Sequence, residues 1–555
     1  MAESAKGRLG ERLINAGLIS KEKLELALKE QKRTGEFLGE VLQNLGFVTE
    51  EGISSSLAAQ SGVRQVELEN YLIDAEVLKL IPENIAKKYK LIPLSLEANK
   101  LTIAMANTFD VIALDEIQKK TGAYVEALSA TESDISNAIE QHYGMKGDSP
   151  DLLEEIIRMA ESGSLSEEDL AKQSPIIRLV DQLITKGVKD TATDIHIEPE
   201  EKTLRVRYRI DGILQSGPSI PKSLQASTTA RIKIMANLNI SENRLPQDGK
   251  ISFYMGKKKI DLRVSTFPTV LGEKVVLRIL DKSKLILGLG KLGFTTENLT
   301  IFKNLLKRSN GIILVTGPTG SGKTTTLYSA LSYINSIEKN IVTLEDPVEY
   351  ELPLICQSQI NIKAGLTFAT GLRSILRQDP DIILVGEMRD AETAEMAIRS
   401  ALTGHLVFST LHTNDSAGTI PRLLDMGMEP FLIASSIVGI MAQRLIRLIC
   451  KDCKEMYEPV EEILEQLGIK RGEQKFYRGK GCKECNNTGY KGRFALFEIL
   501  TVTPKIKKLI IDRAESNIIL KAAREEGMLT LYEDALQKAY QGRTTIEEVL
   551  RVTYG

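Results

Sequence analysis

Residues 317–324 read Gly-Pro-Thr-Gly-Ser-Gly-Lys-Thr, and this octapeptide decides the fold of the segment around it. It fits the pattern G-x-x-x-x-G-K-[ST], in which glycines let backbone N–H groups wrap a chain of phosphates. The apolar run 312–315 predicts a buried strand before it, and 325–331 predicts a helix after it, whose positive end faces the phosphates. This strand–loop–helix unit predicts an ATP site in an α/β domain with a mainly parallel sheet.

Each side chain of the octapeptide has an expected role. Lys323 reaches the β- and γ-phosphates, and Thr324 ligates Mg²⁺. Two histidines bracket the predicted strand 405–412, and a strand end near a γ-phosphate suits a hydrogen-bonding sensor, although a structural role is the competing interpretation for either one. The predicted nucleotide contacts are Gly317, Pro318, Thr319, Gly320, Ser321, Gly322, Lys323, Thr324, Thr325, His405 and His412.

Two acidic positions close other predicted strands. Glu387 ends the segment 381–387, although an ordinary magnesium strand would carry Asp one place earlier, where this chain has Gly386. Glu345 closes a second strand. One carboxylate can hold Mg²⁺ or its waters while the other orients the attacking water, and the sequence leaves this assignment open.

Four of the five cysteines form two C-x-x-C pairs. In a reducing cytosol such pairs indicate metal binding more than disulfides. Four thiolates suit a tetrahedral, structural Zn²⁺. The predicted ligands are Cys450, Cys453, Cys482 and Cys485.

The bulk composition excludes few functions. The 555 residues suggest about three or four domains. A net charge of −2 does not point to a nucleic-acid binder. The start of the chain is polar, with no signal peptide, and the longest apolar run, 431–442, is shorter than the roughly twenty residues of a membrane span. We therefore expect a cytoplasmic protein.

The N-terminal part contains an internal repeat within 8–60. One copy starts at Arg8-Leu9-Gly10 and the other at Phe37-Leu38-Gly39. Each copy predicts two short helices around a glycine stop, with Ser20 as the N-cap of one of them. The expected domains are 1–145, a linker at 146–173, 174–286 with alternating strands at 204–210 and 259–264, and 287–555 with a cysteine-containing subdomain at 446–490.

Segments 317–324, 343–349, 386–390 and 404–414 together resemble the secretion ATPases of type II secretion and type IV pili. Segments 193–199 and 207–212 resemble the domain that precedes the motor in that family, and the cysteines resemble its assembly members, PilB-like and GspE-like, more than the shorter retraction motors. The resemblance implies a multidomain α/β fold: a RecA-like P-loop core, a PAS-like α+β domain before it, a helical and α+β N-terminal domain and a small zinc-binding subdomain.

The resemblance also implies an assembly. It predicts a homohexamer with nucleotide between neighbouring subunits, where Arg263 and Arg278 reach the phosphates through their guanidinium forks. Further candidate arginines are Arg373, Arg377 and Arg389. The implied partners are an inner-membrane platform protein of the PilC or GspF kind and a PilM-like or GspL-like docking protein, which would hold the protein at the inner membrane.

The duplicated segment resembles the MshE-type N-terminal domain that binds cyclic di-GMP. A two-fold-symmetric dinucleotide suits a duplicated half-site, although Phe37 stands where the second copy would carry arginine. The competing interpretation is a helical docking module. The predicted contacts are Arg8, Leu9, Gly10, Gln31, Leu38, Gly39 and Gln60.

The function predicted from these observations is ATP hydrolysis that powers type IV pilus assembly. The alternative within the family is a type II secretion ATPase. A nucleic-acid translocase is disfavoured by the near-neutral charge, and a nucleotide-dependent switch with little turnover is the third class.

Overall fold

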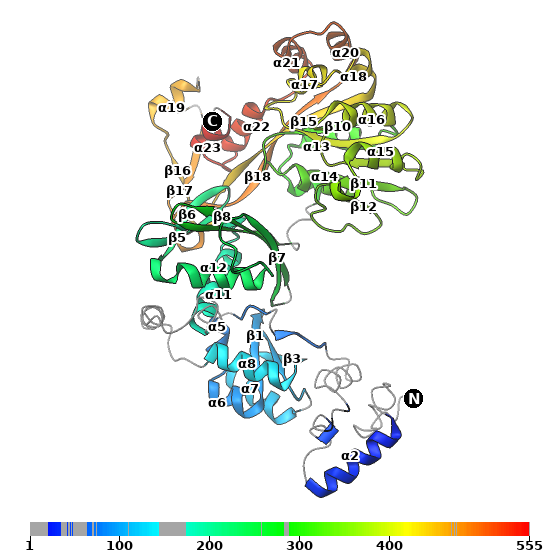
Figure 1. The fold of residues 1–555 in the computed structure, drawn as a ribbon. Helices are drawn as coiled ribbons and strands as arrows, with labels where there is room; N and C mark the ends of the chain where they lie inside the picture. Colours follow the sequence, from blue (N-terminus) through cyan, green and yellow to red (C-terminus); the bar gives the residue numbers. More distant parts are fainter. Residues whose placement is uncertain are drawn as a thin grey trace, which may run out of the picture. The chain divides into compact units, whose positions relative to one another are not determined.

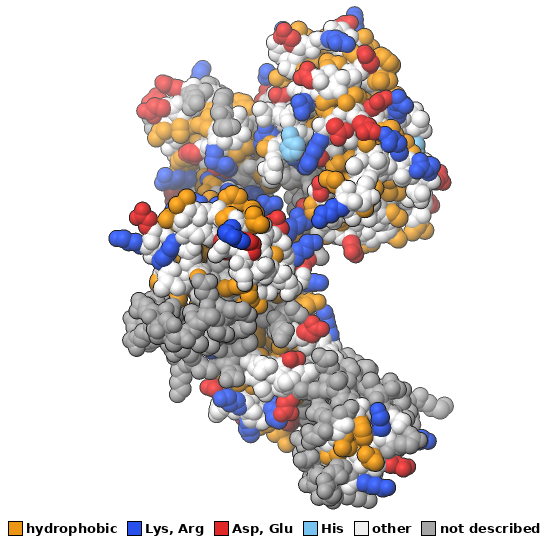
Figure 2. Space-filling view, viewed as in Figure 1, with side chains coloured by type: hydrophobic (Ala, Val, Ile, Leu, Met, Phe, Trp, Pro, Cys, Tyr) orange, Lys and Arg blue, Asp and Glu red, His pale blue; other side chains and the backbone are white. Residues whose placement is uncertain are grey.

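The computed structural model forms two compact units, 1–282 and 283–555 (Figure 1). On the side shown in Figure 2, acidic and basic side chains are interspersed over the described surface. The structure describes residues 20–34, 41–42, 45, 47, 64–68, 71–73, 75–108, 110–143, 174–256, 258–281, 288–467, 469–470, 472 and 474–553.

Among its described residues, the first unit contains helix α2 (Lys21–Thr34) and a small three-stranded sheet. Helix α2 follows Ser20, whose Oγ accepts the amide of Lys23 at 3.4 Å, which confirms the predicted N-cap. In the sheet the central strand is antiparallel to the first and parallel to the third. Its elements are α5 (Ala75–Leu78), α6 (Glu83–Tyr89), β1 (Leu91–Glu97), β2 (Lys100–Met105), α7 (Val111–Thr121), β3 (Tyr124–Ser129) and α8 (Glu132–Tyr143).

The next domain is a six-stranded antiparallel sheet with the order β6-β5-β4-β9-β8-β7. As the alternation predicts, Leu204, Val206 and Tyr208 are buried in its core, which places the intervening arginines of the same strand on the opposite face. Its elements are α11 (Ser174–Lys189), β4 (Asp194–Pro199), β5 (Thr203–Ile210), β6 (Ile213–Pro221), α12 (Gln225–Met235), β7 (Gln247–Met255), β8 (Lys258–Thr269) and β9 (Gly272–Asp281).

The second unit contains a seven-stranded sheet in the order β12-β11-β13-β14-β10-β15-β18. Every pairing is parallel except that between the last two strands. The four strands β10, β11, β13 and β14 are buried throughout, as expected of a parallel sheet covered on both faces. The strands are β10 (Gly311–Thr316), β11 (Ile341–Glu345), β12 (Cys356–Gln359), β13 (Ile382–Val385), β14 (Leu406–Leu411), β15 (Ile437–Ile449) and β18 (Tyr490–Thr501).

Helices cover both faces of this sheet. One core contains Ile313 and Val315 with α13 (Thr296–Leu306) and α14 (Lys323–Ile334). The opposite core contains Ile312 and Leu314 with the helices α15 (Phe368–Ile375), α16 (Ala391–Leu402), α17 (Thr419–Asp425), α18 (Pro430–Ser436), α20 (Pro504–Ile511) and α21 (Ser516–Glu525). The last two helices, α22 (Leu531–Tyr540) and α23 (Ile546–Thr553), pack on β15 and β18. The predicted α/β architecture is confirmed.

Candidate active site and metal centre

The loop 317–322 joins β10 to α14 at the carboxyl edge of the parallel sheet. Gly317, Gly320 and Gly322 have φ angles of 145°, 80° and 89°, which side chains rarely tolerate. A Cβ on Gly317 would also lie 2.4 Å from the carbonyl oxygen of Gln443. Because α14 begins at Lys323, its free N–H groups face the loop, as a phosphate cradle requires.

Lys323 lies over this loop. Its Nζ donates to the carbonyl oxygens of Gly317 at 2.8 Å and Pro318 at 3.2 Å. Burial lowers the pKa of Lys323 to about 8, and the positive charge of Arg444 contributes to the shift. An anion bound here would stabilise the charged form of Lys323 and offset the repulsion from Arg444, so the local electrostatics favour phosphate.

The parallel register brings three more predicted residues to the same edge. Glu345 is the last residue of β11, Glu387 follows β13, and His412 follows β14, while β13 and β14 lie between β11 and β10. With the Thr324 hydroxyl in the first turn of α14, these carboxylates are the oxygen ligands that Mg²⁺ prefers, so the residues fit the predicted ion.

The side chain of Glu345 is held by several hydrogen bonds at the carboxyl edge of the parallel sheet, which is called the nucleotide edge below. It is 4% exposed, and its Oε1 accepts from Thr343 Oγ1 at 2.6 Å and from Gln357 Nε2 at 3.1 Å. Its Oε2 accepts from the hydroxyl of Tyr328 on α14. All three donors are uncharged, so they orient the carboxylate without neutralising it.

Glu387 has a different environment. It forms an ion pair with Arg389. A Cβ on the preceding Gly386 would lie 3.3 Å from the carbonyl oxygen of Leu344 and 3.4 Å from Cα of Glu345. A side chain at that place would therefore pack closely against the end of β11.

His412 faces the same group of residues. Its Nε2 lies 3.4 Å from Glu387 Oε2. Burial lowers the pKa of His412, and the charges of Lys323 and Arg389 lower it further, against a hydrogen bond to the backbone of Gly317. These effects favour the neutral imidazole, which can donate one hydrogen bond and accept another.

The structure corrects the prediction for His405. In the parallel pairing of β14 with β10, Leu406 lies opposite Gly311 and Leu411 lies opposite Thr316. His405 precedes β14, so it lies at the amino edge of the sheet, and its Nδ1 bonds the carbonyl oxygen of Ser400 at 2.8 Å. The prediction that His405 contacts the nucleotide of its own subunit is therefore wrong.

Arg263 and Arg278 lie in the first unit, directly opposite each other on β8 and β9. Arg278 Nε donates to Asp194 Oδ1 at 3.0 Å, and its side chain remains 59% exposed. Of the further arginines, Arg373 pairs with Glu392, Arg377 Nη1 donates to the carbonyl oxygen of Arg373, and Arg389 pairs with Glu387.

Sequence reasoning missed two residues of the site, Gln443 and Arg444. Gln443 Nε2 donates to the carbonyl oxygen of Ser321 at 2.8 Å and fixes the loop. Arg444 Nη1 would lie 3.2 Å from a Cβ on Gly317. The available signal was a polar pair directly after the apolar run 437–442 of β15, at the point where β15 passes the carboxyl end of β10, since Ala442 lies opposite Thr316.

The four cysteines lie close together although they come from two segments that are far apart in the sequence, one after β15 and one before β18. Their sulfur atoms all lie within 4.8 Å of one another, with Sγ–Sγ distances of 3.8 Å for Cys450 and Cys482, 3.8 Å for Cys453 and Cys485, and 3.7 Å for Cys482 and Cys485. A tetrahedral zinc ion with Zn–S bonds of about 2.3 Å has S–S edges of about 3.8 Å. The cluster thus has the dimensions of a zinc site.

Two glycines allow the backbone segments around this site to approach each other. The site lies where β15 ends and β18 begins, next to the start of β16 (Lys454–Tyr457) and the end of β17 (Phe476–Gly479), and α19 (Glu461–Gln466) lies between these two strands in the chain. A Cβ on Gly479 would lie 2.1 Å from the carbonyl oxygen of Gly489, so the two turns can approach only as glycines. The amide of Gly489 donates to Cys485 Sγ at 3.3 Å, which favours a thiolate.

The predicted cyclic di-GMP contacts fall outside the described residues. This holds for Arg8, Leu9, Gly10, Leu38, Gly39 and Gln60, and for the side chain of Gln31.

Comparison with known proteins decides the family. The profile described as "Type II/IV secretion system protein" matches residues 169–551. The chain belongs to this family. A second profile, described as the MshEN domain, matches residues 61–149, which begins after the duplicated segment.

Relatives resemble the chain along its whole length. It is 44% identical to the type IV pilus assembly ATPase PilB of Myxococcus xanthus over 98% of each chain. It is 43% identical to the type II secretion system protein E of Xanthomonas campestris over 99% of each chain. The protein is thus an ATPase of this family.

The X-ray structure of the Legionella pneumophila ATPase DotB covers 67% of this chain and 94% of its own, at 22% identity and a TM-score of 0.51, and this confirms the RecA-like fold of the core. Throughout the described segments, every helix is too short or too polar to cross a membrane.

Proposed function

We propose that the protein hydrolyses ATP to power type IV pilus assembly. The observation that carries the proposal is the convergence of Lys323, Glu345, Glu387 and His412 at one edge of a parallel sheet, in a chain similar end to end to a pilus assembly ATPase. The second candidate is a type II secretion motor, favoured by the relative in Xanthomonas campestris at nearly the same identity and coverage.

Each residue of the site has a proposed task. The loop amides and Lys323 bind the β- and γ-phosphates, and the Thr324 hydroxyl with one of the two glutamates holds Mg²⁺. The ion would neutralise charge that develops on the phosphoryl oxygens. The other glutamate orients the attacking water, and His412 bonds the γ-phosphate or that water. The carboxylate of Glu345 is held by uncharged donors, whereas that of Glu387 pairs with Arg389. This difference supports separate tasks for the two glutamates.

The active site is shared between subunits in this proposal. The protein is a homohexamer in which Arg263 and Arg278 reach a neighbour's nucleotide. The 59% exposure of Arg278 and the oligomeric family support this arrangement. Subunit closure then moves an inner-membrane platform protein of the PilC or GspF kind, while a PilM-like or GspL-like protein docks the cytoplasmic motor at the membrane.

Mixed hexamers test this sharing. Lys323→Ala subunits and Arg263→Ala subunits are each expected to lack turnover. Co-assembled, they create some interfaces with both residues intact, so ATPase activity is expected to exceed that of either parent. No recovery in proven mixed hexamers would show that both residues act within one subunit.

Filament and secretion functions separate in the native host. A Lys323→Ala allele is expected to remove surface pili, seen by electron microscopy, while exported enzymes still reach the medium. Loss of the exported enzymes with normal pili would favour the second candidate.

We also propose that Cys450, Cys453, Cys482 and Cys485 hold one structural Zn²⁺, supported by the sulfur tetrahedron described above. In the N-terminal part we propose that residues 8–60 bind cyclic di-GMP as an effector. The internal repeat and the adjoining MshEN match support this.

A further inference from the structure

Glu498 is a buried carboxylate that the chemistry above does not use. It lies on β18 and is 3% exposed. Its Oε1 accepts from the amide of Ser416 at 2.8 Å and from the Ser416 hydroxyl at 2.6 Å, and its Oε2 accepts from the amide of Leu531 at 3.3 Å. A carboxylate buried with this many donors ties those donors together, because leaving any of them unpaired is costly.

Ser416 belongs to the loop 412–418, which leaves β14 at the nucleotide edge. The start of this loop has two anchors. The amide of Thr413 donates to Thr316 Oγ1 at 2.8 Å, and Arg444 Nη2 donates to the carbonyl oxygen of Asn414 at 2.8 Å. Thr316 ends β10, so the loop runs directly beside the phosphate cradle. Glu498 anchors its far end.

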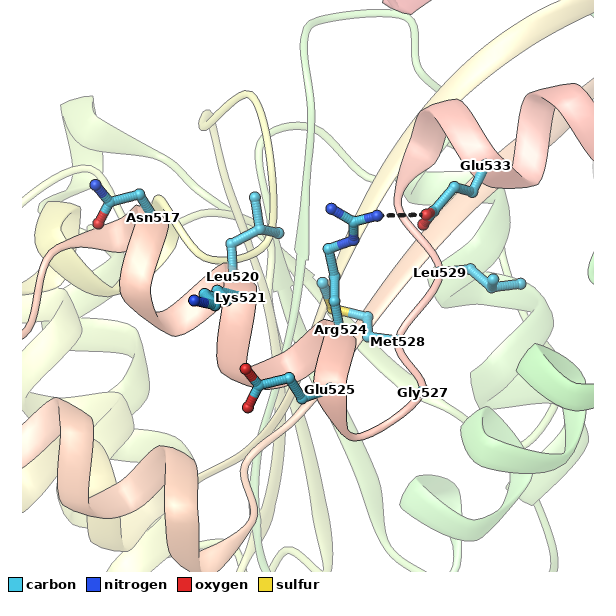
Figure 3. A pocket seen from close by; sticks show the side chains of 9 residues that line it. All are labelled: Asn517, Leu520, Lys521, Arg524, Glu525, Gly527, Met528, Leu529 and Glu533. Atoms are coloured by element: carbon cyan, nitrogen blue, oxygen red, sulfur yellow. Dashed lines mark hydrogen bonds and ion pairs between the residues drawn. The ribbon is translucent and has the colours of Figure 1, made fainter. Parts of the chain in front are cut away.

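The third donor is the amide of Leu531, the first residue of α22, which follows the elbow 526–530 between α21 and α22. Figure 3 shows this elbow, where Arg524 on α21 bonds Glu533 on α22 at 2.7 Å beside a cavity of about 710 Å³. Thr530 caps α22 by a capping box with Glu533. Met528, at the inner side of the elbow, lies with Sδ 3.8 Å from the Ser416 hydroxyl. One buried side chain therefore joins the nucleotide edge to the C-terminal helices.

We propose that Glu498 is a positioning residue for ATP hydrolysis. It holds the 412–418 loop, and with it His412, in place against the phosphate cradle from the side of the α21–α22 elbow. Nucleotide binding depends on the cradle, which Gln443 fixes independently. Loss of Glu498 therefore reduces the turnover rate but leaves the affinity for nucleotide unchanged. The inference rests on the proposed ATPase activity.

The test uses the full-length hexamer with Glu498→Gln. A glutamine retains the shape but offers one acceptor oxygen, and its NH₂ group meets a backbone N–H of Ser416 or Leu531. We expect kcat to fall at least about tenfold, while the Kd for Mg-ADP changes less than about threefold. Ser416→Ala removes only the hydroxyl donor, and we expect kcat to fall about threefold or more. Wild-type kcat in either folded variant overturns the proposal.

A matched control separates positioning from general destabilisation. Asp534 is also buried, accepts the amide of Phe497 beside Glu498 at 2.8 Å, and pairs with Lys538. Its contacts lie within β18 and α22. Asp534→Asn should lower the melting temperature comparably and retain kcat. If both variants lose kcat in proportion to their melting temperatures, Glu498 has only a structural role.

Coupling to His412 gives a second readout. In a His412→Ala background, Glu498→Gln should cost less than about twofold in kcat, because the residue that it positions is already absent. Full additivity would contradict positioning through His412. An inactive wild-type hexamer would instead refute the proposed ATPase function, so the two failures are distinguishable.

Discussion

The affinity for nucleotide should fall as the pH rises from 7 to 9, because Lys323 loses its charge in this range. Burial, with a smaller effect of Arg444, lowers its pKa to about 8. At that value about nine-tenths of the side chain is protonated at pH 7 and about one-tenth at pH 9. Bound phosphate favours the charged form, so binding takes up a proton above pH 8, and affinity should fall about tenfold over the interval.

Calorimetry with a non-hydrolysable ATP analogue in excess magnesium measures this directly. Titrations in two buffers of different ionisation enthalpy also report the proton uptake. The matched variant is Lys323→Arg, which stays charged at pH 9 and should bind more weakly but with no such pH dependence. Arg444→Gln should move the midpoint to higher pH. A wild-type affinity that is constant across the range, or an equal fall in Lys323→Arg, would refute the reasoning.

Three further outcomes are expected. Glu345→Gln and Glu387→Gln should each reduce kcat by about two orders of magnitude or more, and the one that still binds Mg-ATP tightly is the residue that orients water, as binding and turnover assays will show. Metal analysis should find about one zinc per chain, and Cys450→Ser should lose this zinc and lower the melting temperature, whereas a wild-type protein that melts normally without zinc would exclude a structural metal. Cyclic di-GMP should bind the full chain with a Kd below about 100 μM, and Arg8→Ala should weaken it, unless 8–60 is only a docking module.

Local signals made much of the site predictable. The octapeptide at 317–324 carries its glycines and lysine contiguously, so the strand, loop and helix around it follow from a few neighbouring residues. Glu345 and Glu387 were recognisable because each ends a short apolar run, and parallel strands end at a common edge. Cysteine spacing likewise identified all four sulfurs of the tetrahedron.

The tertiary structure alone decided which side chains meet at that edge. His405 and His412 flank the same strand and look equivalent in the sequence, but the parallel pairing with β10 places only His412 at the edge where the loop 317–322 lies. Gln443 and Glu498 look like ordinary polar residues, and their burial against Ser321 and Ser416 comes from strands far away along the chain. The amino-acid sequence was enough to predict the nucleotide loop and the two cysteine pairs, since each of these motifs consists of a few neighbouring residues. Pairing of distant strands determined the rest, because burial and hydrogen bonding of a polar group depend on neighbours that sequence proximity does not specify.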